Sequence, residues 1–159
     1  MDTVKRLLAR RAKSYAALLI DIDGLKLIND MRGHATGDAI IAIIAEAIRA
    51  SIREGDECAR IGGDEFFVFA AGCTTEEAMA IGQRIIDKLA KPSLPLYGAK
   101  ASVSIGVVVL DGADAEFNRM YRDADHALYQ ARYEGKSRIG LFVPSVDDTM
   151  ESPAPAFTG

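Results

Sequence analysis

The chain has 159 residues, 49% of them hydrophobic, so it can bury one core but is too short for two ordinary domains. Its formal net charge of −4 argues against a general nucleic-acid binder or membrane-surface protein, and an anionic substrate would need to bring a cation. No apolar run approaches the ~20 residues that cross a bilayer. We therefore expect one cytoplasmic domain, with Cys58 and Cys73 as reduced core thiols because the chain has no secretory signal.

Apolar periodicity, glycines and prolines predict the elements in chain order. They are a helix at 1–14, a strand at 15–22, helices at 25–31 and from 38 to about 51, strands at 58–61 and 66–71, a helix from the capping box at 74–77 to about 90, a strand at 101–110, a helix at 115–134 and a strand at 138–143. The order βααββαβαβ predicts an α/β sandwich around a central mixed, largely antiparallel sheet. We expect residues 1–14 to precede a folded domain at 15–143, and residues 144–159 to form a disordered tail or linker.

The predicted strand at 15–22 is a continuous apolar run that stops at acids. Because side chains alternate along a strand, Asp21 and Asp23 share one face of it. They lie at the carboxyl end of a central strand, the edge at which open α/β sheets bind ligands. A buried strand has little reason to end in acids unless they serve a site. For Asp23 alone, an Asx turn before the following glycine is the better interpretation.

The stretch Arg60–Phe69 predicts a β-hairpin whose tip carries charge. The pair Gly62–Gly63 can take the positive φ that tight strand connections need. Ile61 before this pair and Phe66–Phe69 after it look like buried strand residues. The tip would therefore present the acid pair Asp64–Glu65 from a rigid base.

Three carboxylates would meet if the strand end and the hairpin tip are neighbours. Asp21, Asp64 and Glu65 would repel one another unless divalent cations lie between them, and hard oxygen ligands suit Mg²⁺ or Mn²⁺. Such cations can support an in-line phosphoryl displacement. The alternative is that these acids are turn and cap residues in solvent, and we favour the metal site for the three together.

Several separated segments between about residues 15 and 143 resemble the GGDEF family of diguanylate cyclases. The matching segments are Asp21–Asp30, which resembles Asp-x-Asp-x-Phe-Lys-x-x-Asn-Asp, Gly33-His34 and Gly37-Asp38, Gly62–Phe66, Val103–Gly106 and Ala124–Ala131. The resemblance implies a fold like that of nucleotidyl cyclases and polymerase palms. It also implies that two GTP molecules are condensed into cyclic di-GMP across a homodimer, each subunit holding one GTP.

The resemblance also implies roles for individual residues. Asp21, Asp64 and Glu65 would hold the metal with the carbonyl of Ile22, and Asp64 would accept the proton, a role that Glu65 could share. Guanine would be recognised by Asn29 and Asp38, with His34 beside them, and the phosphates would be bound by Lys26, Arg132 and Lys136. Three alternatives stay open: Asp38 as a helix N-cap, His34 as a loop-stabilising residue, and Arg132 and Lys136 as ordinary charges at a helix C-terminus.

Arg53 and Asp56 lie just upstream of the hairpin, at the position of the family's inhibitory Arg-x-x-Asp motif. The resemblance implies that they bind cyclic di-GMP, whereas a solvated ion pair is the plain alternative. The family's N-terminal motif Asp-x-Leu-Thr-x-Leu-x-Asn-Arg is absent. We therefore expect an upstream sensory or dimerising domain outside this chain.

Two other functions compete with the cyclase. One is a catalytically silent module that senses GTP or cyclic di-GMP, which the intact acids disfavour. The other is a related cyclase that also accepts ATP, which Asp38 disfavours because adenine lacks the donors that a carboxylate binds in guanine.

Overall fold

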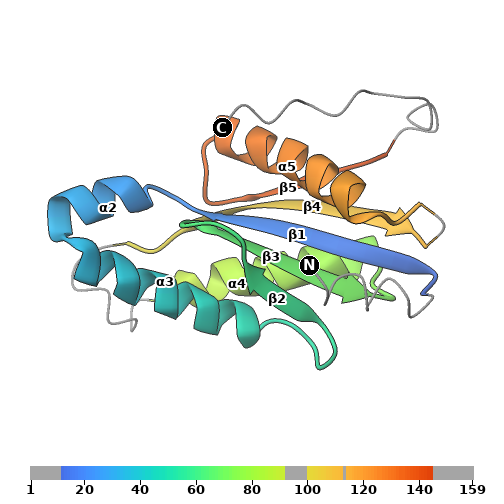
Figure 1. Ribbon diagram of the computed structural model, residues 1–159, viewed down its shortest axis with the longest axis horizontal. Coiled ribbons are helices and arrows are strands. Elements are labelled where there is room, and N and C mark those ends of the chain that lie inside the picture. The colour runs from blue at the N-terminus through green and yellow to red at the C-terminus, as the bar shows by residue number, and fades with distance from the viewer. Residues whose placement is uncertain (1–11, 92–99, 113, 145–159) are drawn as a thin grey trace.

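The computed structural model describes residues 12–91, 100–112 and 114–144 (Figure 1). The predicted N-terminal helix at 1–14, the loop that begins at Pro92 and the tail at 144–159 lie wholly or almost wholly outside these residues. The elements are β1 (Ser14–Ile22), α2 (Leu25–Arg32), α3 (His34–Arg49), β2 (Glu57–Arg60), β3 (Glu65–Ala71), α4 (Thr75–Leu89), β4 (Val103–Asp111), α5 (Phe117–Tyr133) and β5 (Ile139–Phe142). The predicted order βααββαβαβ is confirmed.

The five strands form one sheet in the order β2-β3-β1-β4-β5. Strand β1 lies at its centre and pairs antiparallel with both β3 and β4, while β4 and β5 pair in parallel. Helices α3 and α4 cover one face and α5 covers the other, and α2 projects beyond the sheet at the end of β1 (Figure 1). The predicted sandwich with a mixed, largely antiparallel sheet is therefore confirmed.

Each face of the sheet has its own core, because alternate residues of β1 point to opposite sides. Leu18 and Ile20 belong to the core under α3 and α4, whereas Ala17 and Leu19 belong to the core under α5. The next residue in the second series is Asp21, so this acid lies on the α5 face of the sheet.

Helix α5 packs unusually close to β4. A Cβ atom added at Gly106 would overlap the backbone oxygen of Ala124 and crowd the backbone of Leu128, both in α5. The lack of a side chain at Gly106 is therefore what permits this close approach of the two backbones. The close contact fixes the height of α5 above the sheet, and with it the position of every side chain that α5 directs at the end of β1.

Helix α3 begins at His34, four residues before the predicted start at Asp38. Gly33, with a φ of 86°, makes the whole break between α2 and α3, so the second glycine, Gly37, is helical and buried. Asp38 therefore lies inside the helix, and its interpretation as an N-cap is wrong. The predicted capping box of α4 is confirmed, since the Glu77 amide donates to Thr74 Oγ1 at 3.1 Å.

Two smaller predictions also have outcomes. Cys58 and Cys73 are both free thiols, and burial raises the pKa of Cys73 to about 11, which keeps it in the unreactive thiol form. No helix among the described residues is long and apolar enough to cross a membrane.

Candidate active site

The end of β1 and the hairpin tip lie side by side, as the acid-site interpretation requires. Asp21 on β1 is the register partner of Glu65 on β3. The Ile22 amide donates to the backbone oxygen of Asp64 at 2.9 Å, so the acid pair of the tip is fixed to the strand end. Asp21 is 4% exposed, Glu65 is half-buried and Asp64 is exposed. The exposure of the three acids thus increases from Asp21 in the core, through Glu65, to Asp64 in solvent.

The hairpin tip is built differently from the prediction. Gly62 and Gly63 do not have positive φ, and Ile61 is 42% exposed rather than buried. The Arg60 side chain closes the tip, because its Nε donates to Gly62 O at 3.2 Å and its Nη2 to Gly63 O at 2.8 Å. These two bonds satisfy backbone carbonyls at the tip, which turns without positive φ at either glycine. Phe66–Phe69 are buried as predicted.

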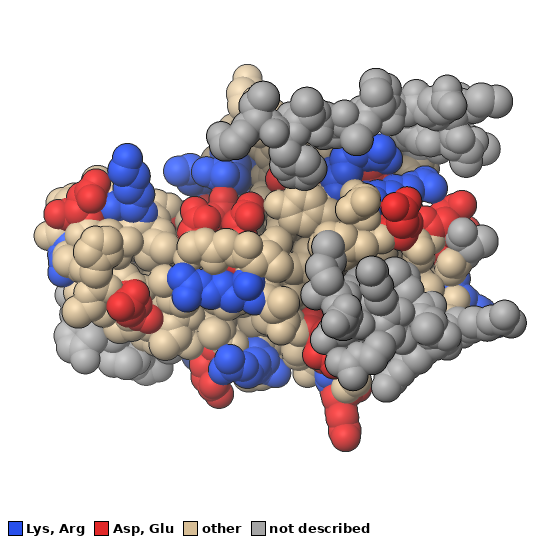
Figure 2. Space-filling model, in the orientation of Figure 1, with Lys and Arg blue, Asp and Glu red and all other residues tan. Residues whose placement is uncertain are grey.

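Asp21 is surrounded by charge. Its Oδ2 lies 2.7 Å from Nη1 of Arg132 in the last turn of α5. Burial, followed by the negative charge of Asp64, raises the pKa of Asp21 to about 7 although Arg132 acts in the opposite direction. The pKa of Glu65 is also raised, mainly by burial and by Asp64. Figure 2 shows acidic side chains gathered at this end of the sheet with basic side chains on both sides.

The three acids have the oxygen ligands that a divalent cation prefers, although their side chains do not converge on one point. Among the described residues, no group of three or more His, Cys, Asp or Glu side chains converges as a metal-binding cluster. However, Asp21 Oδ1 is buried and has no hydrogen-bond partner there. A buried acceptor without a donor, beside two further carboxylates, is the environment that a hard cation satisfies.

The protonation of Asp21 predicts an unusual dependence of stability on pH. Its pKa rises from 3.8 to about 7 on folding, so between these values the folded protein holds a proton that the unfolded chain releases. In metal-free buffer we therefore expect the free energy of unfolding to decrease as the pH rises from about 4 to 7, by at most about 4 kcal/mol from this group. Thermal melts across this range measure it. The Asp21→Asn variant should lose this slope, and parallel profiles for both proteins would contradict the assignment.

Asp23 has a structural role. Its carboxylate accepts hydrogen bonds from Ser102 Oγ at 2.8 Å, Ser104 Oγ at 2.7 Å and the Ser137 amide at 3.1 Å. These bonds join the end of β1 to β4 and to the loop after α5. The preference for a structural role over metal binding agrees with these contacts, although the partners come from distant segments rather than from an Asx turn.

The residues expected to bind the base lie on α2, which projects beyond the sheet, and on the first turns of α3 beside it (Figure 1). The Asn29 side chain covers Gly37, where a Cβ atom would overlap Asn29 Oδ1. That oxygen is buried without a hydrogen-bond partner among the described residues. His34 and Asp38 are exposed on α3. Asn29 is thus held in place by packing, with its carbonyl oxygen buried against α3.

The cations expected to bind phosphate are in two places. Arg132 already contacts the acids, and Lys26 is exposed in the first turn of α2. Lys136 is exposed in the loop after α5 and has a φ of 61°, a left-handed conformation that is uncommon for a lysine. Its neighbour Ser137 donates to Asp23, so this loop is attached to the acid-bearing end of β1.

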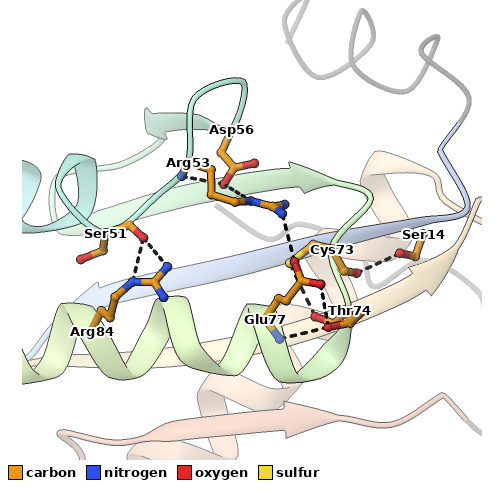
Figure 3. Close-up of polar contacts among 8 residues, drawn as sticks. All are labelled: Ser14, Ser51, Arg53, Asp56, Cys73, Thr74, Glu77 and Arg84. Carbon is orange, nitrogen blue, oxygen red and sulfur yellow. Dashed lines mark hydrogen bonds and ion pairs between the residues drawn. The ribbon is translucent and has the colours of Figure 1, made fainter.

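Arg53 and Asp56 form a second polar group at the opposite end of β2 from the hairpin tip (Figure 3). Asp56 Oδ2 accepts from the Arg53 amide at 2.9 Å, and Arg53 Nη1 donates to Glu77 Oε2 at 3.0 Å. Arg84 of α4 donates to Ser51 O at 2.7 Å and so anchors the same loop to α4. The bond to Glu77 was not predicted from the sequence, because the capping box already explained that residue.

The mixed sheet with acids on its central strand and on an adjoining hairpin defines a class, the palm-like nucleotidyl cyclases. A family model described as "Diguanylate cyclase, GGDEF domain" matches residues 2–138, and the chain belongs to this family. Diguanylate cyclase A of Treponema denticola is 34% identical over 137 residues, which are 82% of this chain and 36% of that protein. The cyclic di-GMP phosphodiesterase NbdA of Pseudomonas aeruginosa is 35% identical over 136 residues, which are 83% of this chain and 17% of that protein. The chain thus spans little more than a third of the first relative and less of the second.

Solved structures agree with the family. The active GGEEF domain of a diguanylate cyclase from Vibrio cholerae has a TM-score of 0.79 at 28% identity, with 91% of this chain and 92% of that chain covered. An EAL/GGDEF domain protein from M. capsulatus has a TM-score of 0.75 at 38% identity, with 90% of this chain and 96% of that chain covered. The similarity in both cases extends over nearly the whole folded domain.

Proposed function

We propose that this domain is a diguanylate cyclase that condenses two GTP molecules into cyclic di-GMP and pyrophosphate. The observation that carries the proposal is the junction of Asp21, Asp64 and Glu65 at one edge of the sheet, where the Ile22 amide binds the backbone of Asp64. Family membership gives the reaction its chemical identity. The intact acid trio favours catalysis over mere binding.

The acids are suited to hold one or two Mg²⁺ or Mn²⁺ ions, together with the carbonyl of Ile22. A bound cation would make the attacking 3′-hydroxyl more acidic and would neutralise the leaving pyrophosphate. In our proposal Asp64 accepts the proton, because it is the most exposed of the three acids, and Glu65 beside it can share the role. Asp21 is the buried anchor of the set.

Guanine recognition is assigned to Asn29 and Asp38. A carboxylate accepts hydrogen bonds from guanine N1–H and its exocyclic amine, and an amide can donate to ring acceptors, whereas adenine lacks those donors. Because Asn29 Oδ1 is buried against Gly37, the Nδ2 group is the end of this amide that would donate to the base. His34 lies at the start of α3, in the same projecting part of the molecule.

A substitution at Gly37 tests the placement of Asn29. Alanine there would displace the flexible Asn29 side chain, while the helix itself tolerates alanine better than glycine. We expect Gly37→Ala to weaken binding of a non-hydrolysable GTP analogue about tenfold without loss of fold, measured by calorimetry and thermal melting. Because both changes act on one side chain, Gly37→Ala should add nothing in an Asn29→Ala background. Full additivity would contradict this placement of Asn29.

Phosphate binding is assigned to Lys26, Arg132 and Lys136. Arg132 Nη1 lies 2.7 Å from Asp21 Oδ2, so cation binding by Asp21 would release the guanidinium for the triphosphate. Arginine binds phosphate through two parallel donors, in place of the lysine typical of the family, so affinity can change without being lost.

A homodimer is required by the reaction, because two GTP molecules must face each other. Exposed apolar side chains support association at this end of the molecule: Leu27 is 62% exposed and Met31 74% on α2, and Ile61 is 42% exposed at the hairpin tip. We propose that a second copy covers them during catalysis. Product feedback through Arg53 and Asp56 belongs to the same proposal.

A second candidate function is a silent module that binds GTP or cyclic di-GMP. It is favoured by the 35% identical relative named a phosphodiesterase, since that name leaves cyclase activity of its matching segment unassigned. Incubation of the purified chain with GTP or ATP and Mg²⁺, followed by chromatography, separates the candidates. The cyclase should convert GTP alone into cyclic di-GMP, whereas binding of GTP without any product would favour the silent module.

A further inference from the structure

The loop at residues 134–138, between α5 and β5, has an uncommon backbone conformation. Lys136 has a φ of 61° and Ser137 a φ of 49°, and within 12–91, 100–112 and 114–144 they alone combine a side chain with positive φ. This left-handed conformation is unfavourable for residues other than glycine, and it persists where the surrounding structure fixes it. Two such residues in succession therefore indicate that specific contacts hold this loop.

Three hydrogen bonds fix the two peptide groups that flank Lys136. Its amide donates to Ala131 O at 3.1 Å, and its carbonyl accepts from Arg138 Nε at 3.2 Å. The next amide, that of Ser137, donates to Asp23 Oδ2 at 3.1 Å. The first two bonds are local, whereas the third joins the loop to the end of β1. Asp23 thus fixes where the backbone of Lys136 lies relative to β1.

Asp23 is itself held firmly by the start of β4 and the residue before it. Its Oδ1 accepts from Ser104 Oγ at 2.7 Å, and its Oδ2 accepts from Ser102 Oγ at 2.8 Å. The Asp23 amide donates to Ser102 O at 2.9 Å, so its backbone is fixed as well. Asp21 lies two residues earlier in the chain. The carboxylate that binds the loop therefore has a fixed position beside the acid site.

The side chain of Lys136 is available to an anionic ligand. It is exposed, and within the described part of the chain its ammonium forms no ion pair. Arg132, one turn earlier, is in contrast paired with Asp21 at 2.7 Å. A lysine has a long and flexible side chain, so a fixed backbone limits the region that its ammonium can reach.

We propose that Asp23 is a positioning residue, which holds the loop so that Lys136 is oriented toward the triphosphate of GTP. The inference rests on the proposed function, which assigns phosphate binding to Lys136. It extends the structural role of Asp23, because loss of its carboxylate would lower the affinity for substrate as well as the stability. The role requires hydrogen-bond acceptors at this position rather than a ligand for a cation.

The test compares Asp23→Ala with Asp23→Asn. Alanine removes the acceptor for Ser137, so we expect binding of a non-hydrolysable GTP analogue with Mg²⁺, measured by calorimetry, to weaken roughly tenfold, as in Lys136→Ala. Asparagine keeps an oxygen for Ser102 and Ser137, and its Nδ2 can donate to the Ser104 hydroxyl. Asp23→Asn should therefore bind the analogue nearly as the unchanged protein does. An equal loss in both variants would indicate cation binding by the charge and would overturn the inference.

A double-mutant cycle shows whether Asp23 acts through Lys136. Asp23→Ala should have no further effect on analogue affinity in a Lys136→Ala background, and additive losses would overturn the inference. Ser104→Ala is the control for stability, because it removes one bond to Asp23 and leaves the bond from Ser137. It should lower the melting temperature without changing analogue affinity. If Asp23→Ala does not fold, Arg138→Ala loosens the same peptide group from a 46% exposed side chain and should give the same non-additive loss.

The remaining outcomes separate this inference from the cyclase proposal. Unchanged analogue affinity in Asp23→Ala, in a chain that makes cyclic di-GMP, would overturn the positioning role and leave the cyclase standing. The expected binding pattern in a chain that makes no cyclic di-GMP would overturn the cyclase and leave the positioning role standing. Failure of the unchanged protein to bind the analogue would overturn both.

Discussion

Asp64→Asn is expected to lower cyclic di-GMP formation by at least roughly 10³-fold while the fold survives. The asparagine would keep the shape of the side chain but would have neither the charge that binds a cation nor the basicity that accepts a proton. The Asp64 side chain is exposed at the hairpin tip, and the bond that joins the tip to β1 uses its backbone oxygen. Stability should therefore change little, in contrast with the loss of activity.

The measurement is the initial rate of cyclic di-GMP formation at saturating GTP and Mg²⁺, with a thermal melt for each protein. Asp87→Asn is a matched control, because this aspartate lies on α4, away from the acid site, and bonds only to Gln83 among the contacts described. It should retain full activity. Retained activity in Asp64→Asn would refute the assignment of the metal site to the hairpin tip.

Arg53→Ala is expected to relieve inhibition by cyclic di-GMP, raising the half-inhibitory concentration at least about tenfold. Arginine can bind guanine or phosphate through paired donors, and removing one such charge-assisted interaction weakens binding by about a factor of ten. Arg53 forms ion pairs with Asp56 and Glu77, and its side chain is 45% exposed. Its ion pairs are therefore weak, and we expect its removal to change the free energy of unfolding by less than about 1 kcal/mol.

The inhibition curve is measured with added cyclic di-GMP at constant GTP. Arg49→Ala serves as the control, because Arg49 is an exposed arginine at the end of α3 with one long ion pair to Glu46. Its inhibition curve should match that of the unchanged protein. An unchanged curve for Arg53→Ala would reduce the Arg-x-x-Asp motif to a solvated loop ion pair.

Much of the fold is predictable because local patterns and tertiary packing agree. The apolar run that becomes β1 is buried on both faces, and the capping box that begins α4 makes its predicted bond. The predicted start of α3 was wrong because two glycines, Gly33 and Gly37, offered equal breaks, and only packing decides between them. Gly37 is helical since the absence of a side chain makes room for Asn29.

The acids of the site can be predicted from the sequence, but most of the side chains that contact them cannot. The motifs identify Asp21, Asp64 and Glu65, but the contacts of Arg132 with Asp21 and of Glu77 with Arg53 depend on how the helices pack on the sheet. Arg132 was predicted as a phosphate ligand, but its ion pair with Asp21 was not. The role of Arg60 could not be predicted, because its bonds to Gly62 and Gly63 follow from the shape of the hairpin tip rather than from a sequence pattern.

The central claim is that this edge of the sheet is half of a catalytic centre, completed by a second copy of the chain. The most direct test is the rate of cyclic di-GMP formation from GTP and Mg²⁺ per mole of protein, over a wide series of protein concentrations. We predict that this specific rate rises with concentration, levels off when dimers dominate, and is high at all concentrations in a tethered dimer. No cyclic di-GMP at any concentration or in the tethered dimer, or a specific rate independent of concentration down to high dilution, would contradict the claim.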